Sequence, residues 1–169
     1  GKIQDAITLT LEGTDGSTLT LRYGFIVEEV TVNSSDTLKA ALANQSVETV
    51  KVSGDITLDE AVNVDRQVTV EVNDGAQLNL NDSFTIGEKA TLINKGTITN
   101  NGTMTNNGSF DTYEGKLAGT GHVIVANGAV LKINANYNNG ADSMLPAVTK
   151  IEVQSGGALQ SMTTDGSEE

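Results

Sequence analysis

Three consecutive six-residue units decide the fold: NKGTIT (residues 94–99), NNGTMT (residues 100–105) and NNGSFD (residues 106–111). Each unit holds Asn, any residue, Gly, a hydroxyl residue, one large apolar residue and a polar residue. A helix is excluded, because apolar residues six apart drift around a 3.6-residue turn and Gly and Asn are poor helix formers. A short strand followed by a tight corner fits instead. The units predict a β-solenoid in which each unit forms one side of a rung, meaning one full circuit of the coil.

The three units also predict how their side chains point. Their apolar residues Ile98, Met104 and Phe110 should enter one core layer from three directions, and three sides of six residues make a rung of about 18 residues. We expect the Thr and Asn residues to form a solvent-exposed shell, with Asn amides stacked or bonded to neighbouring corners. The stretch therefore predicts shape and says almost nothing about an activity.

A longer phrase of nine residues recurs on both sides of this stretch. Each copy has two inward strand positions, a Gly, Asp or Asn corner, and then a small and a large apolar residue. The copies are VKVSGDITL (50–58), VEVNDGAQL (70–78), VIVANGAVL (123–131) and IEVQSGGAL (151–159). The step of 20 residues between the first two copies corresponds to one rung.

The spacing predicts about five rungs between Val47 and Met162, stacked into a body roughly 20–25 Å long at ~4.8 Å per strand. Residues 134–146 break the rhythm and contain the only proline, so we expect a protruding loop there. Residues 163–169 are polar and acidic, which is typical of a disordered tail.

The chain before the coil divides into a strand segment and a short helix. Residues 1–32 alternate apolar and polar residues around turn-forming residues 14–17, which predicts a β-hairpin that either ends a preceding module or extends the solenoid. Ser34 or Ser35 is a suitable N-cap for a helix near residues 35–45, whose apolar stripe would cover the first coil. An alternative is a crossover helix without a capping role. The β-helix domain is thus expected over residues 33–162.

Composition excludes several classes of function. The 169 residues carry a net charge of −12, which argues against binding to nucleic acid or to anionic membranes. There is no cysteine and only one histidine, so disulfides, thiolate metal sites and most catalytic triads are excluded. No apolar run approaches the ~20 residues that span a bilayer. The chain opens on Gly1-Lys2 without a signal peptide, and we expect an exported protein whose signal has been removed.

At these phrases the chain resembles single-stranded right-handed β-helix proteins of the pectate-lyase-like and bacterial adhesin-like group, over about residues 34–162. The capping-type helix, the Gly-Ala-x-Leu phrases at 75–78 and 128–131, and the Asn-x-Gly-Thr run carry the resemblance. It implies an all-β right-handed parallel β-helix in an exported bacterial protein that meets glycans or other surfaces. No catalytic motif of the group is matched.

Carboxylates are the only abundant reactive groups. Asp55 and Asp74 fall near equivalent corners of successive rungs, and Asp82 follows soon after. Stacked about 5 Å apart, such residues would share a Ca²⁺ or form the carboxylate pair of a retaining glycosidase. The competing interpretation, which we favour, is that they are corner residues serving turn formation and solubility.

Other candidate groups are scattered. Arg66 and Lys51 are the only plausible bases near the aspartates for a lyase reaction, although an Asp65–Arg66 pair is more simply a solvated corner. Tyr113 and Tyr137 lie in segments that break the rhythm and are candidate ligand contacts. His122 is expected to be a solvated or hydrogen-bonded residue at a strand start.

Two hypotheses follow. The first is a non-enzymatic extracellular or cell-surface module without a cofactor, acting as adhesin, scaffold or spacer and touching glycans or neighbouring modules. The alternative is a carbohydrate-active or glycan-binding β-helix that uses the acidic face with Asp55, Asp74 and Asp82.

Overall fold

The structure is a computed structural model that describes residues 5–12, 18–25, 29–134 and 150–162. Several features expected from the sequence lie outside these residues. They are the hairpin turn at 14–17, the loop from residue 135 to 146, Tyr137 and the tail at 163–169.

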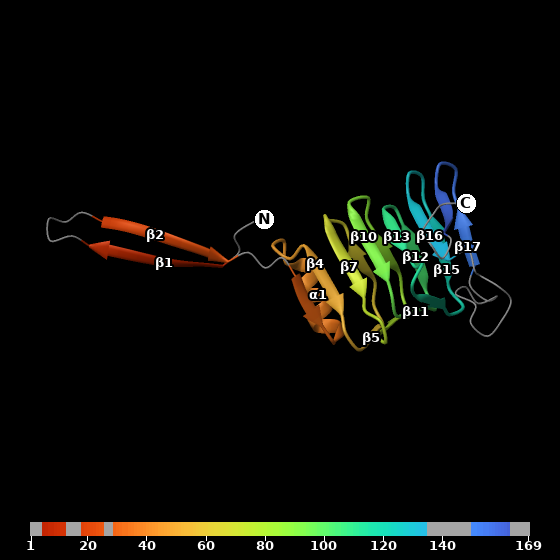
Figure 1. Ribbon diagram of the computed structural model, residues 1–169, viewed down its shortest axis with the longest axis horizontal. Coiled ribbons are helices and arrows are strands. Elements are labelled where there is room, and N and C mark those ends of the chain that lie inside the picture. The colour runs from red at the N-terminus through yellow and green to blue at the C-terminus, as the bar shows by residue number, and fades with distance from the viewer. Residues whose placement is uncertain (1–4, 13–17, 26–28, 135–149, 163–169) are drawn as a thin grey trace.

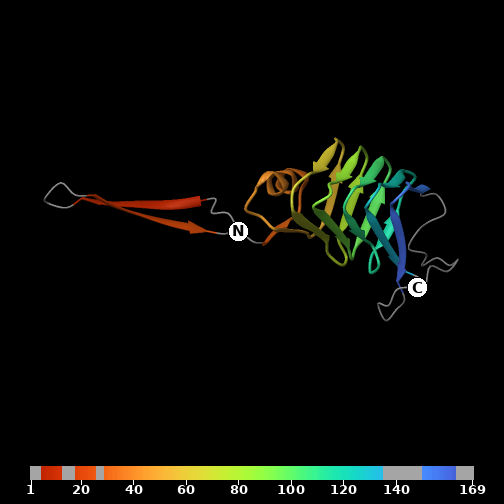
Figure 2. The ribbon, with the colours of Figure 1, turned by 90° about the horizontal axis from the view of Figure 1, so that it is seen from above.

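Three parallel sheets wrap around one core, and the chain visits them in turn (Figures 1 and 2). The seven-stranded sheet contains β3 (Glu29–Val32), β4 (Thr49–Val52), β7 (Val68–Val72), β10 (Ala90–Asn94), β13 (Ser109–Asp111), β16 (Val130–Asn134) and β18 (Ala158–Met162). The four-stranded sheet contains β5 (Asp55–Leu58), β8 (Gln77–Leu80), β11 (Thr97–Asn100) and β14 (Lys116–Ala118). The five-stranded sheet contains β6 (Val62–Val64), β9 (Phe84–Ile86), β12 (Thr103–Asn106), β15 (His122–Val125) and β17 (Lys150–Val153). The chain is therefore a parallel β-solenoid of about five turns, as the sequence predicts.

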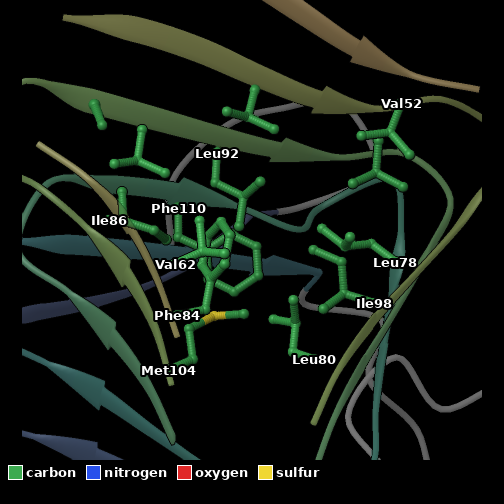
Figure 3. Packing of buried hydrophobic residues seen from close by; sticks show 14 of the residues in the cluster. Val52, Val62, Leu78, Leu80, Phe84, Ile86, Leu92, Ile98, Met104 and Phe110 are labelled. Atoms are coloured by element: carbon green, nitrogen blue, oxygen red, sulfur yellow. The ribbon is translucent and has the colours of Figure 1, made fainter. Parts of the chain in front are cut away.

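Strand register stacks like side chains into columns that run along the coil. On the inner side of the seven-stranded sheet one column contains apolar residues only: Val30, Val50, Val70, Leu92, Phe110, Leu131 and Leu159. Because successive residues of a strand point to opposite faces, every second residue of each strand, which is usually apolar, contributes its side chain to an inward column. Figure 3 shows the resulting interior, where side chains from all three sheets meet.

The run of three six-residue units folds as predicted in its apolar residues. Leu92 and Phe110 are in register on β10 and β13, so this rung takes 18 residues. Ile98, Met104 and Phe110 belong to three different sheets and are fully buried. The prediction of an exposed Asn shell is wrong for Asn94, Asn100 and Asn106, which are 0–1% exposed. Each lies two residues after a buried apolar residue and therefore shares its inward face.

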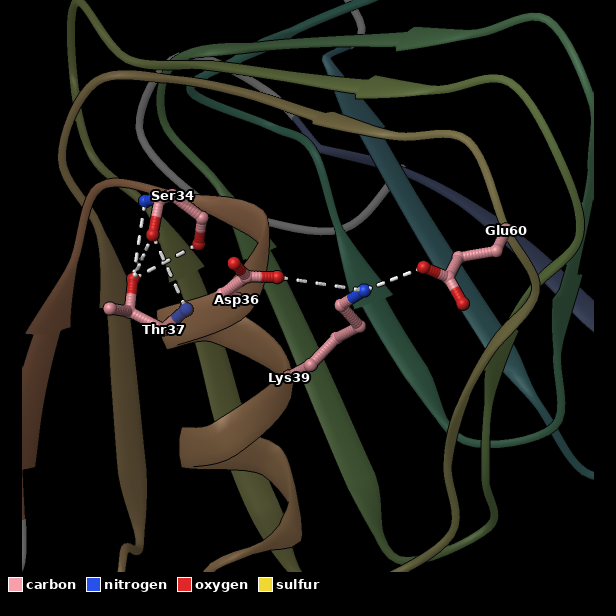
Figure 4. Close-up of polar contacts among 5 residues, drawn as sticks. All are labelled: Ser34, Asp36, Thr37, Lys39 and Glu60. Carbon is pink, nitrogen blue, oxygen red and sulfur yellow. Dashed lines mark hydrogen bonds and ion pairs between the residues drawn. The ribbon is translucent and has the colours of Figure 1, made fainter.

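The short helix α1 (Ser35–Ala43) covers the first end of the coil. Leu38 and Ala41 are buried in the common core, and in Figure 2 the helix lies over the N-terminal end of the sheets. Its N-cap is Ser34: the Thr37 N–H donates to Ser34 Oγ (3.3 Å), and the Ser34 N–H donates to Thr37 Oγ1 (3.2 Å), as Figure 4 shows. A capping helix is thus confirmed.

The described strands of the N-terminal segment belong to two different sheets. The strands β1 (Asp5–Glu12) and β2 (Thr18–Phe25) pair antiparallel as a two-stranded sheet of their own. By contrast β3, which the sequence places with that segment, pairs in parallel with β4 and begins the seven-stranded sheet. The solenoid thus starts before the helix that caps it. Among the described helices, none has the length and apolar character needed to cross a membrane.

Candidate functional site

The three candidate aspartates are exposed; Asp55 and Asp74 lie at the same corner of successive rungs, as expected, and Asp82 lies at another corner. Asp55 begins β5, Asp74 lies in the turn before β8, and Asp82 lies between β8 and β9. The register pairs Asp55 with Gln77, so the expected stacking of Asp55 on Asp74 is wrong by three residues. Within the described ranges, no group of three or more His, Asp or Glu residues is arranged to hold a metal ion.

We therefore expect isothermal titration with CaCl2 to give no saturable binding, because Ca²⁺ needs six to eight converging oxygen ligands. The double variant Asp55→Asn/Asp74→Asn should give the same trace as the wild type. A dissociation constant below about 1 mM that disappears in the double variant would restore the metal site.

Arg66, one of the two candidate bases, is committed to the chain's own backbone. Its Nε donates to Leu42 O (2.9 Å), one terminal nitrogen to Val47 O (2.6 Å), and the other to Ala41 O (3.2 Å). Ala41 and Leu42 are in the last turn of α1, where carbonyls lack partners within the helix, although the Asn44 N–H at the C-cap also donates to Ala41 O (3.2 Å). Burial lowers the pKa of the Arg66 guanidinium, and the Asp65 carboxylate partly offsets that effect. Arg66 therefore fastens the capping helix to the coil.

Lys39 and Lys51 on the surface pair with carboxylates of other strands or turns. Lys51 Nζ, the other candidate base, lies 2.9 Å from Glu29 Oε2 on β3. The hydrogen bond to Glu29 raises the pKa of Lys51, and a hydrogen bond to Glu60 raises that of Lys39. The Lys39–Glu60 contact of 2.7 Å joins α1 to the turn after β5 (Figure 4). Because these lysines stay protonated, neither has the character of a general base.

An open groove of about 790 Å³ lies beside the start of the seven-stranded sheet. Thr49, Thr69 and Thr91 are in register on β4, β7 and β10 and follow one wall. The remaining lining consists of the polar or charged residues Gln45, Glu48, Asp65, Arg66, Gln67 and Lys89, together with the apolar Val68. The groove offers hydroxyl, amide and charged groups, and it contains neither an aromatic ring nor any of the three candidate aspartates.

Tyr113 and His122 occupy separate places. Tyr113 lines a small cleft of about 180 Å³ with Ile93, Lys95, Asp111 and Glu114. His122 Nε2 lies 3.4 Å from Glu152 Oε2, whose carboxylate is also 3.8 Å from Lys150 Nζ. The His122 and Glu152 side chains face each other between the strands β15 and β17, and the buried Nε2 of His122 has no hydrogen-bond partner within the described residues. The structure does not bring Tyr113 and His122 together with the aspartates or with Arg66.

Three buried asparagines form a polar layer that the sequence analysis missed. Asn94, Asn100 and Asn106 end the three strands of one rung. Each Nδ2 donates to the backbone carbonyl of the first residue of a strand in the next rung: Lys116 O (3.0 Å), His122 O (3.1 Å) and Val130 O (2.8 Å). Side chains two residues apart in a strand face the same side, so the position of each asparagine two residues after an inward apolar residue could have predicted its burial. The layer ties one rung to the next at all three corners.

A second polar ladder runs along the outside of one corner. Asn81 Nδ2 donates to Asp59 Oδ1 (2.7 Å), and Asn101 Nδ2 donates to Asn81 Oδ1 (3.2 Å). The Thr120 N–H reaches Asn101 Oδ1 at 3.5 Å and extends the ladder to a fourth rung. The expectation that exposed Asn amides bond to neighbouring corners is confirmed here.

Comparison with known proteins gives no match to a family model, to a curated protein or to a solved structure. The fold and the contacts described above are therefore the basis for a functional proposal.

Proposed function

We propose that the protein is a non-enzymatic module of a bacterial cell-surface or secreted protein, of the adhesin-like β-helix kind, that acts as a stiff spacer or scaffold. The observation that supports this is the use of its polar side chains. Arg66 and the three buried asparagines donate their hydrogen bonds to backbone carbonyls of the same chain. In an enzyme, polar groups of this kind would contact a substrate. In this chain they join the capping helix and successive rungs to one another.

Stiffness follows from the continuity of the sheets. The seven-stranded sheet spans the whole coil, and each of its parallel ladders adds backbone hydrogen bonds between consecutive rungs. Bending the rod would require these ladders and the packed interior to deform together, and protein interiors resist such deformation. A rod of this kind can hold attached modules at a fixed separation.

The rod predicts narrow distances between spin labels at its two ends. Thr31 and Lys132 are five strands apart in one outward column of the seven-stranded sheet, which places their Cα atoms about 24 Å apart. Asn63 and Glu152 are four strands apart on the five-stranded sheet, at about 19 Å. Because the chain has no cysteine, Thr31→Cys/Lys132→Cys and Asn63→Cys/Glu152→Cys label only these positions.

Pulsed electron–electron double resonance should give one narrow distribution of label-to-label distances for each pair. The centres of the two distributions should differ by about one strand spacing. A broad or two-peaked distribution for either pair would show a hinge in the coil and would contradict the spacer function.

The polar groove supports a second candidate, a glycan-binding module. Sugar hydroxyls can bond to hydroxyl, amide and charged groups such as those of Thr69, Gln67 and Lys89. A glycan array, together with assays for reducing sugars and unsaturated products on acidic polysaccharides, separates the candidates. Binding that is lost in Thr69→Ala/Lys89→Ala would favour the glycan module. Turnover that is lost in Asp55→Asn/Asp74→Asn would overturn the non-enzymatic proposal.

A further inference from the structure

The two ends of the solenoid are finished differently. At the N-terminal end, α1 lies over the coil and buries Leu38 and Ala41 against the core. At the other end the last described strands are β17 and β18, each hydrogen-bonded to a neighbour on one side only within the described residues. They are joined by a corner at residues 154–157, so two adjacent sides of the coil end in open strand edges.

The open end exposes the interior columns of the coil. Leu159 on β18 is 45% exposed and Val153 on β17 is 42% exposed, whereas Leu131 and Val125, which precede them in the same columns, are 0% exposed. Among the described residues these two are the most exposed large apolar side chains. They occupy positions that a further layer of strands would cover.

The free backbone groups of this end can be assigned from the ladder. The N–H of Ala158 donates to Ala129 O, and those of Lys150 and Gln154 donate to Gly121 O and Val125 O, all on the inner neighbours. In a parallel ladder alternate residues bond to opposite sides. The N–H and C=O groups of Ile151 and Val153 on β17, and of Leu159 and Ser161 on β18, therefore face the open edge. Open edges of this kind pair readily with another chain.

A second copy cannot cover the open end with its own N-terminal end, because α1 obstructs two sides of that end. Two C-terminal ends, by contrast, can face each other. A twofold axis through the corner at residues 154–157 places β17 of one copy over β18 of the other, antiparallel, and the reverse pair forms at the same time. Both copies then cover Leu159 and Val153 and continue the packing between rungs.

Charge at this end permits the contact. The whole chain carries −12, yet β18 holds no charged residue and the charges of Lys150 and Glu152 on β17 cancel. The paired strands therefore bring no like charges into direct contact, and long-range repulsion between the acidic bodies is screened by salt. The two edge strands are thus nearly neutral on a strongly acidic molecule, and the three acidic residues among 163–169, which follow β18 in the sequence, make the contact depend on screening by salt.

We propose that this end is a self-association surface, and that the protein forms a twofold tail-to-tail dimer in which β17 and β18 of one copy pair antiparallel with β18 and β17 of a second copy. The dimer would double the length of the rod and leave the two capped ends pointing outward.

Sedimentation equilibrium between about 1 μM and about 1 mM measures the dimer directly. We expect a reversible dimer that tightens as NaCl rises. The double variant Val153→Glu/Leu159→Glu should lose it, because four added charges meet in the contact. The matched control Asn63→Glu/Gln77→Glu adds the same charge at exposed positions of the coil body and should dimerise as the wild type does.

Two further variants test the backbone pairing and the axis. Ser161→Pro removes an N–H that faces the open edge, so the monomer should fold and the dimer should weaken at least about tenfold. With a mild oxidant, Ser155→Cys at the axis should form a disulfide-linked dimer, whereas Asp36→Cys at the capped end should not. A wild type that stays monomeric throughout overturns the proposal, and so does a dimer that persists in both Val153→Glu/Leu159→Glu and Ser161→Pro.

Discussion

Replacing Arg66 with alanine is expected to lower the free energy of unfolding by about 4 kcal/mol. The guanidinium donates to three carbonyls of the cap region, at Ala41, Leu42 and Val47, and to Gln67 O. Each hydrogen bond from a charged group contributes about 1.5–3 kcal/mol, and the contributions do not add fully. A loss of this size is a large part of the 5–15 kcal/mol that typically stabilises a domain.

Urea denaturation followed by circular dichroism measures the loss, and hydrogen exchange locates it. In a solenoid each rung contacts only its neighbours, so α1 and β4 should exchange faster while β12 and β15 keep their protection. Arg66→Lys should fall between wild type and Arg66→Ala, because one ammonium cannot reach three carbonyls at once. Asp65→Asn, at the exposed neighbouring residue, serves as the control. A change below about 0.5 kcal/mol in Arg66→Ala would refute the fastening role.

Asn106→Ala should lower the free energy of unfolding by about 3 kcal/mol, and Asn100→Ala by only about 1 kcal/mol. Asn106 uses both ends of its amide: Nδ2 donates to Val130 O, and Oδ1 accepts from the Gly108 N–H at 3.1 Å. Asn100 donates to His122 O, but its buried Oδ1 has no partner in the described structure. Removing Asn100 therefore removes an unfavourable group together with a favourable bond, whereas removing Asn106 only leaves groups unpaired.

Parallel urea titrations of the two variants test this difference of about 2 kcal/mol. Exposed Asn63, changed to alanine, is the matched control and should stay within about 0.5 kcal/mol of wild type. Equal losses for Asn100→Ala and Asn106→Ala would mean that the unpaired Oδ1 carries no penalty.

The coil itself was predictable because its signal is local. Apolar alternation and Gly or Asn corners repeat at the rung period, so Val50 and Val70 could be assigned to one kind of position from sequence alone. The phrases align Leu131 with Leu78, yet the register places Leu131 in the column of Val50 and Val70, so the later copies of the phrase lie on other sides of the coil.

The burial of Asn94 was missed for a different reason. Asparagine is typical of corners, and this preference predicts exposure. Its position two residues after the inward Leu92 predicts burial, and burial is what the structure shows.

Contacts between distant rungs had no comparable signal. Arg66 bonds to carbonyls 19 to 25 residues earlier, and backbone carbonyls are the same in every sequence. Asp55 and Asp74 appeared equivalent because both flank a Gly, yet the register follows the apolar residues Ile56 and Leu78. Function is harder still to read, because the residue types that could act on a ligand are here also the ones that join the rungs.

The 18-residue rung has an evolutionary consequence. Thr69, Thr91 and Ser109 are in register, so deleting residues 91–108 would bring Ser109 onto Thr69 and leave every later column in place. Duplicating the same segment would lengthen the molecule by about 4.8 Å without changing either end. Length can thus change in single heritable steps, by unequal recombination within a repeated stretch of gene, and each intermediate would still have a closed interior.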